Sequence, residues 1–294
     1  MEWSELVEKR GKRNERGDII ALNLSGLELE TLPAEIWQLD QLIELNIGNN
    51  QLQSLPPEIG QLGSLIELNV LDNELETLAP EIGQLTALKR LNANDNQLGT
   101  LPETIGQLNS LIELNISGNQ LRTLPPEIGQ LSSLIGLEIA DNLLETLPLA
   151  IGQLQALDDL VMTNNRLETL PPEIGQLDVL TQLFVGGNQL RTLPVEVGQL
   201  SGLETLYIKK NQLKTLPAEI GQLRALNNLN VSDNQLESLP TDLSQLTELK
   251  NLDVSGNPMQ SLPPITPRCH VHGLEESLIE SSPDQWVKNK EDLD

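Results

Sequence analysis

Residues 42–64 read LIELNIGNNQLQSLPPEIGQLGS, and residues 65–87 repeat them closely as LIELNVLDNELETLAPEIGQLTA. The shared pattern is LxxLxLxxNxLxxLPxxIxxL followed by two linking residues, and it runs without insertion or deletion from Ile19 to about residue 271. A fixed period of this length predicts a stack of similar structural units rather than a globular fold. The eleven copies begin at Ile19, Leu42, Leu65, Leu88, Leu111, Leu134, Leu157, Leu180, Leu203, Leu226 and Leu249.

The first half of each copy predicts a short strand. Leu45 and Ile47 lie two residues apart, so they face one side of an extended segment while Asn46 faces the other. Asn50 follows at a position that most copies share, and a buried asparagine requires hydrogen bonds for its amide. We expect those bonds to reach the backbone of the turn and of neighbouring copies.

The second half predicts a turn that closes one coil, because Pro56 and Pro57 cannot continue a strand. One coil cannot bury its seven apolar positions alone, so neighbouring coils must stack. The predicted fold is an α/β solenoid: a right-handed arc of eleven repeats with a parallel sheet on its concave side and a helical N-terminal cap.

Three segments follow from this pattern: a helical cap at residues 1–18, the solenoid at 19–271, and a C-terminal cap or tail at 272–294. Residues 2 to 13 predict an amphipathic helix, and Trp37 stands where most copies have glycine. We expect Trp3 and Trp37 to pack in the cap. In the tail, Ser282 and the residues after it resemble a helix start ahead of Trp286, with a docking segment as the alternative.

Composition restricts the partner. With 43 acidic and 18 basic residues the net charge is −25, which disfavours nucleic acid and anionic membranes and favours a protein with a basic or neutral surface. The single cysteine excludes paired-cysteine end caps, and the charged N-terminus lacks the apolar segment of a signal peptide. We expect a cytoplasmic monomer, with secretion as an effector as the alternative.

Cys269, His270 and His272 form the one cluster with catalytic or metal-binding residue types. A structural zinc site needs four ligands, and a nucleophilic thiol needs a base and an oxyanion site on a scaffold. The sequence supplies neither around this cluster, and it contains no phosphate-binding loop. It therefore predicts a protein without catalytic residues, metal or cofactor.

The outward strand position departs from its own consensus in adjacent copies. It reads Asn23, Asn46, Asn69, Asn92, Asn115, Glu138, Val161, Phe184, Tyr207, Asn230 and Asp253. Phe184 and Tyr207 are the only Phe and Tyr of the chain, and Lys209 and Lys210 follow as a basic pair. Aromatic residues beside cations are typical of interfaces. We predict a partner-binding surface of Glu138, Val161, Phe184, Tyr207, Lys209 and Lys210; the alternative is that the rings only cover the sheet.

A secondary candidate is the pair Lys89 and Arg90 in the fourth copy. Arg90 is expected between Glu67 and Glu113 on the flanking strands. A ladder of cross-strand ion pairs would account for it without a ligand.

The segment LPPEIGQL at residues 55–62, 124–131 and 170–177 resembles the leucine-rich-repeat family, in its 23-residue LPxxIxxL class. Similar repeats occur in Ras-group proteins, Scribble-like scaffolds and Roco repeat domains, and the near-identity of the copies looks most like bacterial and cyanobacterial members. The resemblance implies a non-enzymatic signalling scaffold that binds a protein on its concave face. The alternatives are the recognition domain of a larger GTPase-type signalling enzyme or secreted effector, and a small enzyme that uses the Cys269 segment.

Overall fold

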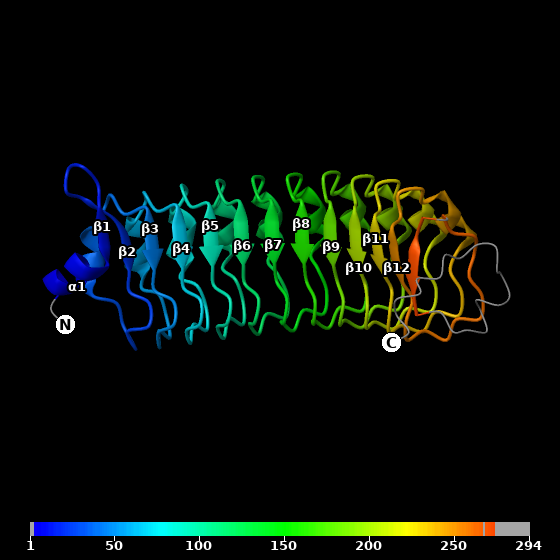
Figure 1. The fold of residues 1–294 in the computed structure, drawn as a ribbon. Helices are drawn as coiled ribbons and strands as arrows, with labels where there is room; N and C mark the ends of the chain where they lie inside the picture. The colour runs from blue at the N-terminus through cyan, green and yellow to red at the C-terminus, as the bar shows by residue number, and fades with distance from the viewer. Residues whose placement is uncertain (1–2, 267, 274–294) are drawn as a thin grey trace, which may run out of the picture. The chain divides into compact units, whose positions relative to one another are not determined.

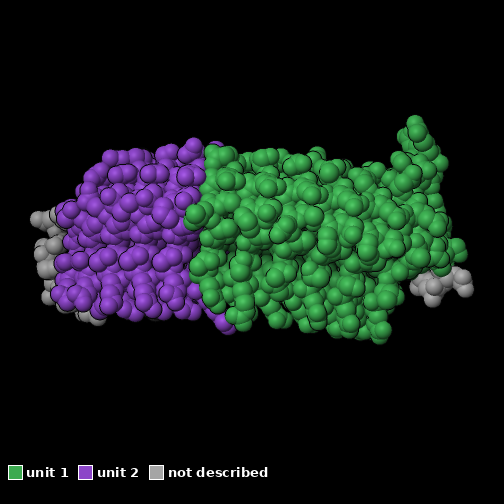
Figure 2. All heavy atoms as spheres, turned by 180° about the vertical axis from the view of Figure 1, so that it is seen from behind, with its two compact units in different colours: residues 1–157 green, residues 158–294 purple. Residues whose placement is uncertain are grey.

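The computed structural model describes residues 3–266 and 268–273, and the chain divides into two compact units, residues 1–157 and 158–294 (Figure 2). In both units the coils carry a short strand on one side, of three residues in all but the first coil, and a five-residue 3₁₀ helix follows each of the strands β2 to β11 (Figure 1). The predicted solenoid is therefore confirmed. Its helical segments are 3₁₀ rather than α-helical, since a coil of 23 residues has room for little more than one turn.

Unit 1 contains the N-terminal elements. These are α1 (Trp3–Arg10), β1 (Gly11–Arg13), β2 (Ile19–Asn23), η1 (Ala34–Gln38), β3 (Glu44–Asn46), η2 (Pro57–Gln61), β4 (Glu67–Asn69), η3 (Pro80–Gln84), β5 (Arg90–Asn92), η4 (Glu103–Gln107), β6 (Glu113–Asn115), η5 (Pro126–Gln130), β7 (Gly136–Glu138) and η6 (Leu149–Gln153). Strands β2 to β7 pair in parallel with a constant offset of 23 residues.

Unit 2 continues the same alternation. Its elements are β8 (Asp159–Val161), η7 (Pro172–Gln176), β9 (Gln182–Phe184), η8 (Val195–Gln199), β10 (Thr205–Tyr207), η9 (Ala218–Gln222), β11 (Asn228–Asn230), η10 (Thr241–Gln245), β12 (Asn251–Asp253) and β13 (His270–His272). Its strands also pair in parallel.

The helix expected at residues 2–13 is shorter than predicted. It ends at Arg10 because the chain turns at Gly11, where a Cβ atom would lie 2.6 Å from the carbonyl oxygen of Val7. Residues 11–13 instead form β1, which pairs antiparallel with β2 and covers the edge that β2 would otherwise expose. In this N-terminal cap Val7 is buried, while Trp3 and Trp37 are half-buried.

The seven apolar positions of each coil form the core. In the second copy Leu42, Leu45, Ile47, Leu52, Leu55, Ile59 and Leu62 are each at most 4% exposed. The predicted inward and outward assignment is therefore correct. Branched aliphatic side chains fill this interior closely, and the cost of losing one would combine lost transfer free energy with a cavity.

The recurring asparagine is bonded as the sequence predicts. In the third copy, Asn73 donates from Nδ2 to the carbonyl oxygens of Ile47 at 3.1 Å, Val70 at 3.1 Å and Leu71 at 3.2 Å. Its Oδ1 accepts the N–H of Leu52 at 3.0 Å. One buried amide thus joins two successive coils, so the asparagine fixes both the turn and the stacking of its neighbour.

The end of the repeat differs from expectation. No strand was predicted around Cys269, yet His270–His272 forms β13 and pairs in parallel with β12. Val271 lies opposite Leu252, so this shortened last coil adds one more strand to the sheet of unit 2. The helix start expected from Ser282 to Trp286 lies outside the described residues.

Candidate functional site

The outward asparagines of the strands have a structural role that the sequence did not reveal. The side-chain oxygen of each accepts the backbone N–H two residues farther on, a local turn that asparagine and aspartate form readily. For example, Asn46 Oδ1 accepts the N–H of Gly48 at 3.0 Å. The same bond is made by Asn23, Asn46, Asn69, Asn92, Asn115, Asn230 and Asp253.

Four adjacent copies lack this bond, and they are the copies with Glu138, Val161, Phe184 and Tyr207. Within unit 2 the affected donors are the backbone N–H groups of Thr163, Gly186 and Lys209. None of these three has an acceptor among the described residues. We call the outward strand side chains and the turns that follow them the sheet face. The sheet face therefore lacks a stabilising hydrogen bond in the three copies that carry Val161, Phe184 and Tyr207.

The two rings form a single surface element. Phe184 and Tyr207 are directly opposite each other on β9 and β10, with ring centroids 5.1 Å apart and planes inclined by 22°. Val161 on β8 lies opposite Phe184, and all three side chains are half-buried. Stacked aromatic pairs contribute about 0.5–1.5 kcal/mol beyond their burial. This stack presents a rigid apolar strip at low entropic cost.

Two unpaired cations lie beside the strip. Lys209 follows the buried Ile208, so it emerges on the same side as Tyr207. Lys209 and Lys210 are both exposed, and neither takes part in an ion pair within the described part of the chain. Lys210 has φ of 55°, at a turn position where the other copies of unit 2 have asparagine, aspartate or glycine.

A polar hollow borders Tyr207 on its other side. It has a volume of about 230 Å³ and is lined by Tyr207, Asn228, Leu229, Asn230, Asn251, Asp253 and His272. Asp253 is already engaged, since it accepts from Ser255 and from Asn230 Nδ2. His272 was missed by sequence reasoning as a sheet-face residue, although the alternation in residues 270–272 was a signal for a strand.

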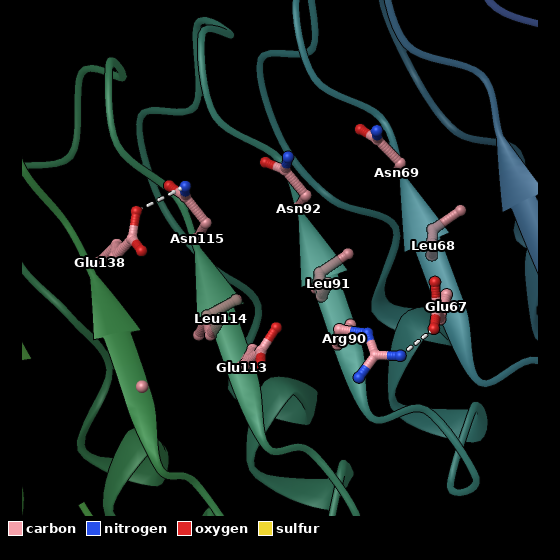
Figure 3. A pocket seen from close by; sticks show the side chains of 11 residues that line it. Glu67, Leu68, Asn69, Arg90, Leu91, Asn92, Glu113, Leu114, Asn115 and Glu138 are labelled. Atoms are coloured by element: carbon pink, nitrogen blue, oxygen red, sulfur yellow. Dashed lines mark hydrogen bonds and ion pairs between the residues drawn. The ribbon is translucent and has the colours of Figure 1, made fainter. Parts of the chain in front are cut away.

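The Arg90 candidate is explained by its neighbours. Arg90 on β5 forms an ion pair with Glu67 on β4 (Figure 3), as the sequence predicts. The hydrogen bond and charge of Glu67 raise the pKa of Arg90, and Glu113 adds to this only through its charge. Both groups are well exposed, so the pair contributes little to stability. The exposed Lys89 precedes the strand.

A second hollow of about 310 Å³ lies over the same strands of unit 1. Gly136 leaves space there, because a Cβ atom at this residue would have only Glu113 Cγ nearby, at 4.0 Å. Glu138 points toward Asn115, whose Nδ2 donates to Glu138 Oε2 at 2.8 Å (Figure 3). Glu138 is thus held by its neighbour in unit 1.

Among the described residues, the surroundings of Cys269 do not form a catalytic arrangement. Its sulfur lies 3.7 Å from the carbonyl oxygen of His270, and no group of three or more potential metal ligands occurs in residues 3–266 and 268–273. Burial raises the pKa of the Cys269 thiol to about 11. A nucleophilic cysteine requires the opposite shift.

We therefore expect Cys269 to react slowly with iodoacetamide at neutral pH. A pKa raised from 9.0 to about 11 leaves roughly a hundredfold less thiolate than an ordinary thiol has, and the rate should increase as pH rises toward that value. Mass spectrometry after timed alkylation measures the rate, with the urea-unfolded chain as the control. Equal rates for the folded and unfolded chains would contradict the assignment.

Comparisons with known proteins agree with this architecture. A family model described as a leucine-rich repeat region matches residues 76–166 and 160–262, and a leucine-rich-repeat model matches residues 41–62. The search of curated proteins found no match. No helix within the described ranges is long and apolar enough to cross a membrane.

Three solved structures illustrate the similarity. A leucine-rich-repeat protein of Leptospira interrogans is 29% identical, with 92% of this chain and 98% of that one covered and a TM-score of 0.53. The effector YopM of Yersinia pestis is 29% identical over 88% of this chain and 72% of its own, with a TM-score of 0.65. The plant peptide hormone receptor RGFR1, solved in complex with RGF2, is 30% identical over 84% of this chain and 48% of its own, with a TM-score of 0.71. The chain thus spans about half the length of that receptor.

Proposed function

Because the chain belongs to the leucine-rich-repeat family, we propose that it is a non-enzymatic scaffold that binds a protein partner on the sheet face of unit 2. Leucine-rich repeats are typically protein-interaction domains, and the similar plant peptide hormone receptor RGFR1 was solved in complex with RGF2. One observation supports this location above others: the stacked Phe184 and Tyr207 stand where seven other copies have an asparagine or aspartate that closes a turn.

Replacing the turn-closing asparagine by an aromatic residue has a cost for the isolated chain. The copies with Phe184 and Tyr207 lack an internal hydrogen bond, which typically contributes about 0.5–1.5 kcal/mol. They also expose an apolar side chain to water. The lost bonds do not stabilise the isolated solenoid, although the stacking of the two rings offsets part of the loss. Both changes favour association, because rigid aromatic side chains beside unpaired cations provide the anchors of protein interfaces.

A selection experiment tests the proposal. A library of random displayed peptides is selected on the immobilised full chain, and binders are measured against the Phe184→Ala/Tyr207→Ala protein. Truncating such an anchor typically costs about 2 kcal/mol, roughly thirtyfold in affinity for each residue. The fold should be retained, because truncation of these outward side chains should cost little more than the stacking contribution of about 0.5–1.5 kcal/mol and leaves the buried core intact.

Gln182→Ala/Thr205→Ala is the matched control, since both residues lie on the same two strands and the same face as the rings but belong neither to the aromatic pair nor to the lysines. It should bind the selected peptides like the parent. The proposal fails if no peptide is selected, or if the selected peptides bind the Phe184→Ala/Tyr207→Ala protein as well as the parent.

The likeness to the effector YopM supports a second possibility. The chain would then be a secreted effector itself, or the recognition domain of a larger one. The two readings differ in location rather than in the binding surface. Immunoblotting of cell and culture-medium fractions with an antibody against the chain distinguishes them and also gives the native mass.

A further inference from the structure

Two copies of the same turn differ in one hydrogen bond. Gly48 and Gly186 occupy equivalent positions, and a Cβ atom at either would lie 3.0–3.1 Å from the carbonyl oxygen of the next coil, so their surroundings match. The N–H of Gly48 donates to Asn46, whereas Gly186 follows Phe184 and has no such acceptor. The N–H of Lys209, two residues after Tyr207, lacks one for the same reason.

These donors lie beside the two unpaired lysines. The side chain of Lys209 extends over Gly186, since its Cγ would lie 3.2 Å from a Cβ atom there. An ammonium group and a free backbone N–H on one exposed residue favour an anionic oxygen acceptor, because hydrogen bonds to a charged group are roughly twice as strong as neutral ones.

Lys210 contributes a second cation at a strained position. A lysine at φ of 55° lacks the local side-chain bond that lets asparagine or aspartate tolerate this conformation. Apart from Glu28 in the first copy, every other non-glycine residue with positive φ in the described ranges is asparagine or aspartate. In unit 2 this strained lysine occurs in the copy that carries Tyr207, where Lys210 adds a second positive charge to that of Lys209.

Resting on the proposed function, we infer that this surface recognises an extended protein segment with an apolar side chain next to an aspartate or glutamate. The apolar side chain packs on Phe184 and Tyr207. The carboxylate binds Lys209 and Lys210 and accepts the N–H of Lys209. The net charge of −25 disfavours a densely acidic partner, so the segment carries an isolated carboxylate within a neutral or basic sequence.

A double-mutant cycle tests the carboxylate contact. Peptides selected as above are synthesised with amidated C-termini, and each aspartate or glutamate is replaced in turn by its amide. On the parent chain, replacement of one acidic residue should weaken binding about tenfold. On the Lys209→Met/Lys210→Met protein, which retains the length of both side chains, the same replacement should change affinity less than about twofold.

Lys214→Met/Lys250→Met is the control of equal charge, because both residues are exposed lysines of unit 2 outside the surface. It should retain the tenfold effect. The inference is overturned if the replacement weakens binding equally on the parent and the Lys209→Met/Lys210→Met protein, or if the selected peptides share no acidic residue. In either case peptides that still depend on Phe184 and Tyr207 leave the proposed function intact.

Discussion

Replacing Asn188 by leucine should lower the free energy of unfolding by about 3 kcal/mol or more. Asn188 Nδ2 donates to the carbonyl oxygens of Met162 at 3.0 Å and Val185 at 3.0 Å, and its Oδ1 accepts the N–H of Leu167 at 3.0 Å. All of these groups are within unit 2. Leucine leaves the N–H of Leu167 without an acceptor, and a buried unsatisfied group costs about 1–3 kcal/mol. The carbonyl oxygens of Met162 and Val185 each lose one of two donors and keep the amides of Asn165 and Asn211, and each lost bond adds about 0.5–1.5 kcal/mol. Urea denaturation followed by circular dichroism measures the loss.

Two matched variants separate the hydrogen bonds from the change in side chain. Asn188→Asp keeps the shape of the side chain and the oxygen that accepts from Leu167 but turns a carboxylate oxygen toward the carbonyl groups, so it should also destabilise the chain strongly. Asn228→Leu makes the same exchange on the sheet face, where no buried backbone group depends on the amide, and should cost about 0.5 kcal/mol or less. A parental denaturation midpoint for Asn188→Leu would contradict a structural asparagine ladder.

The two asparagine ladders show which part of the fold could be read from the sequence. Asn50 follows two inward apolar residues and precedes a third, so its burial and its need for hydrogen bonds were predictable. The outward Asn46 carried no such signal. Its bond to the N–H of Gly48 depends on how the chain bends after the strand, and the periodicity of side chains does not encode that bend. The sequence showed that the outward asparagine is uniform in most copies, but not that a hydrogen bond to the backbone requires it.

The candidate site was predicted through its exceptions. Phe184 and Tyr207 occupy equivalent positions of adjacent copies, so the repeat register alone placed the rings side by side, and the structure confirms the stack. The free N–H groups could not be predicted, because they exist only relative to the bond that the other copies make. The binding role of the surface stays a prediction, as do the domain boundaries at residues 18 and 271 and the bacterial subclass.

The ends of the chain were harder, because they lack the repeat that carried the prediction. Residues 11–13 form β1 because the helix stops at Gly11, and residues 270–272 form β13 after a coil of only 19 residues. Each of these strands covers one edge of a sheet, where an unpaired strand would invite association.

Replacing Gly175 by alanine should destabilise unit 2 by about 2–3 kcal/mol. Gly175 lies in η7, and a Cβ atom there would be 2.4 Å from the carbonyl oxygen of Glu196 in η8 and 2.9 Å from Glu196 Cβ. A backbone oxygen cannot move aside unless η8 moves with it. Inserting a methyl group into such a contact costs about 1–3 kcal/mol. Urea denaturation of Gly175→Ala measures the effect against the parent.

The chain itself offers the control for this contact. In η10 the equivalent residue is Ser244, which is exposed, and no further 3₁₀ helix follows η10 in the described residues. Glycine is therefore present where a next helix stacks in unit 2 and absent where none does. Ser244→Ala should change stability by about 0.5 kcal/mol or less, and so should Gly63→Ala, where a Cβ atom would have no neighbour within 4 Å. If Gly175→Ala unfolded at the same urea concentration as these two controls, close stacking of the 3₁₀ helices would not be what requires glycine in the repeat.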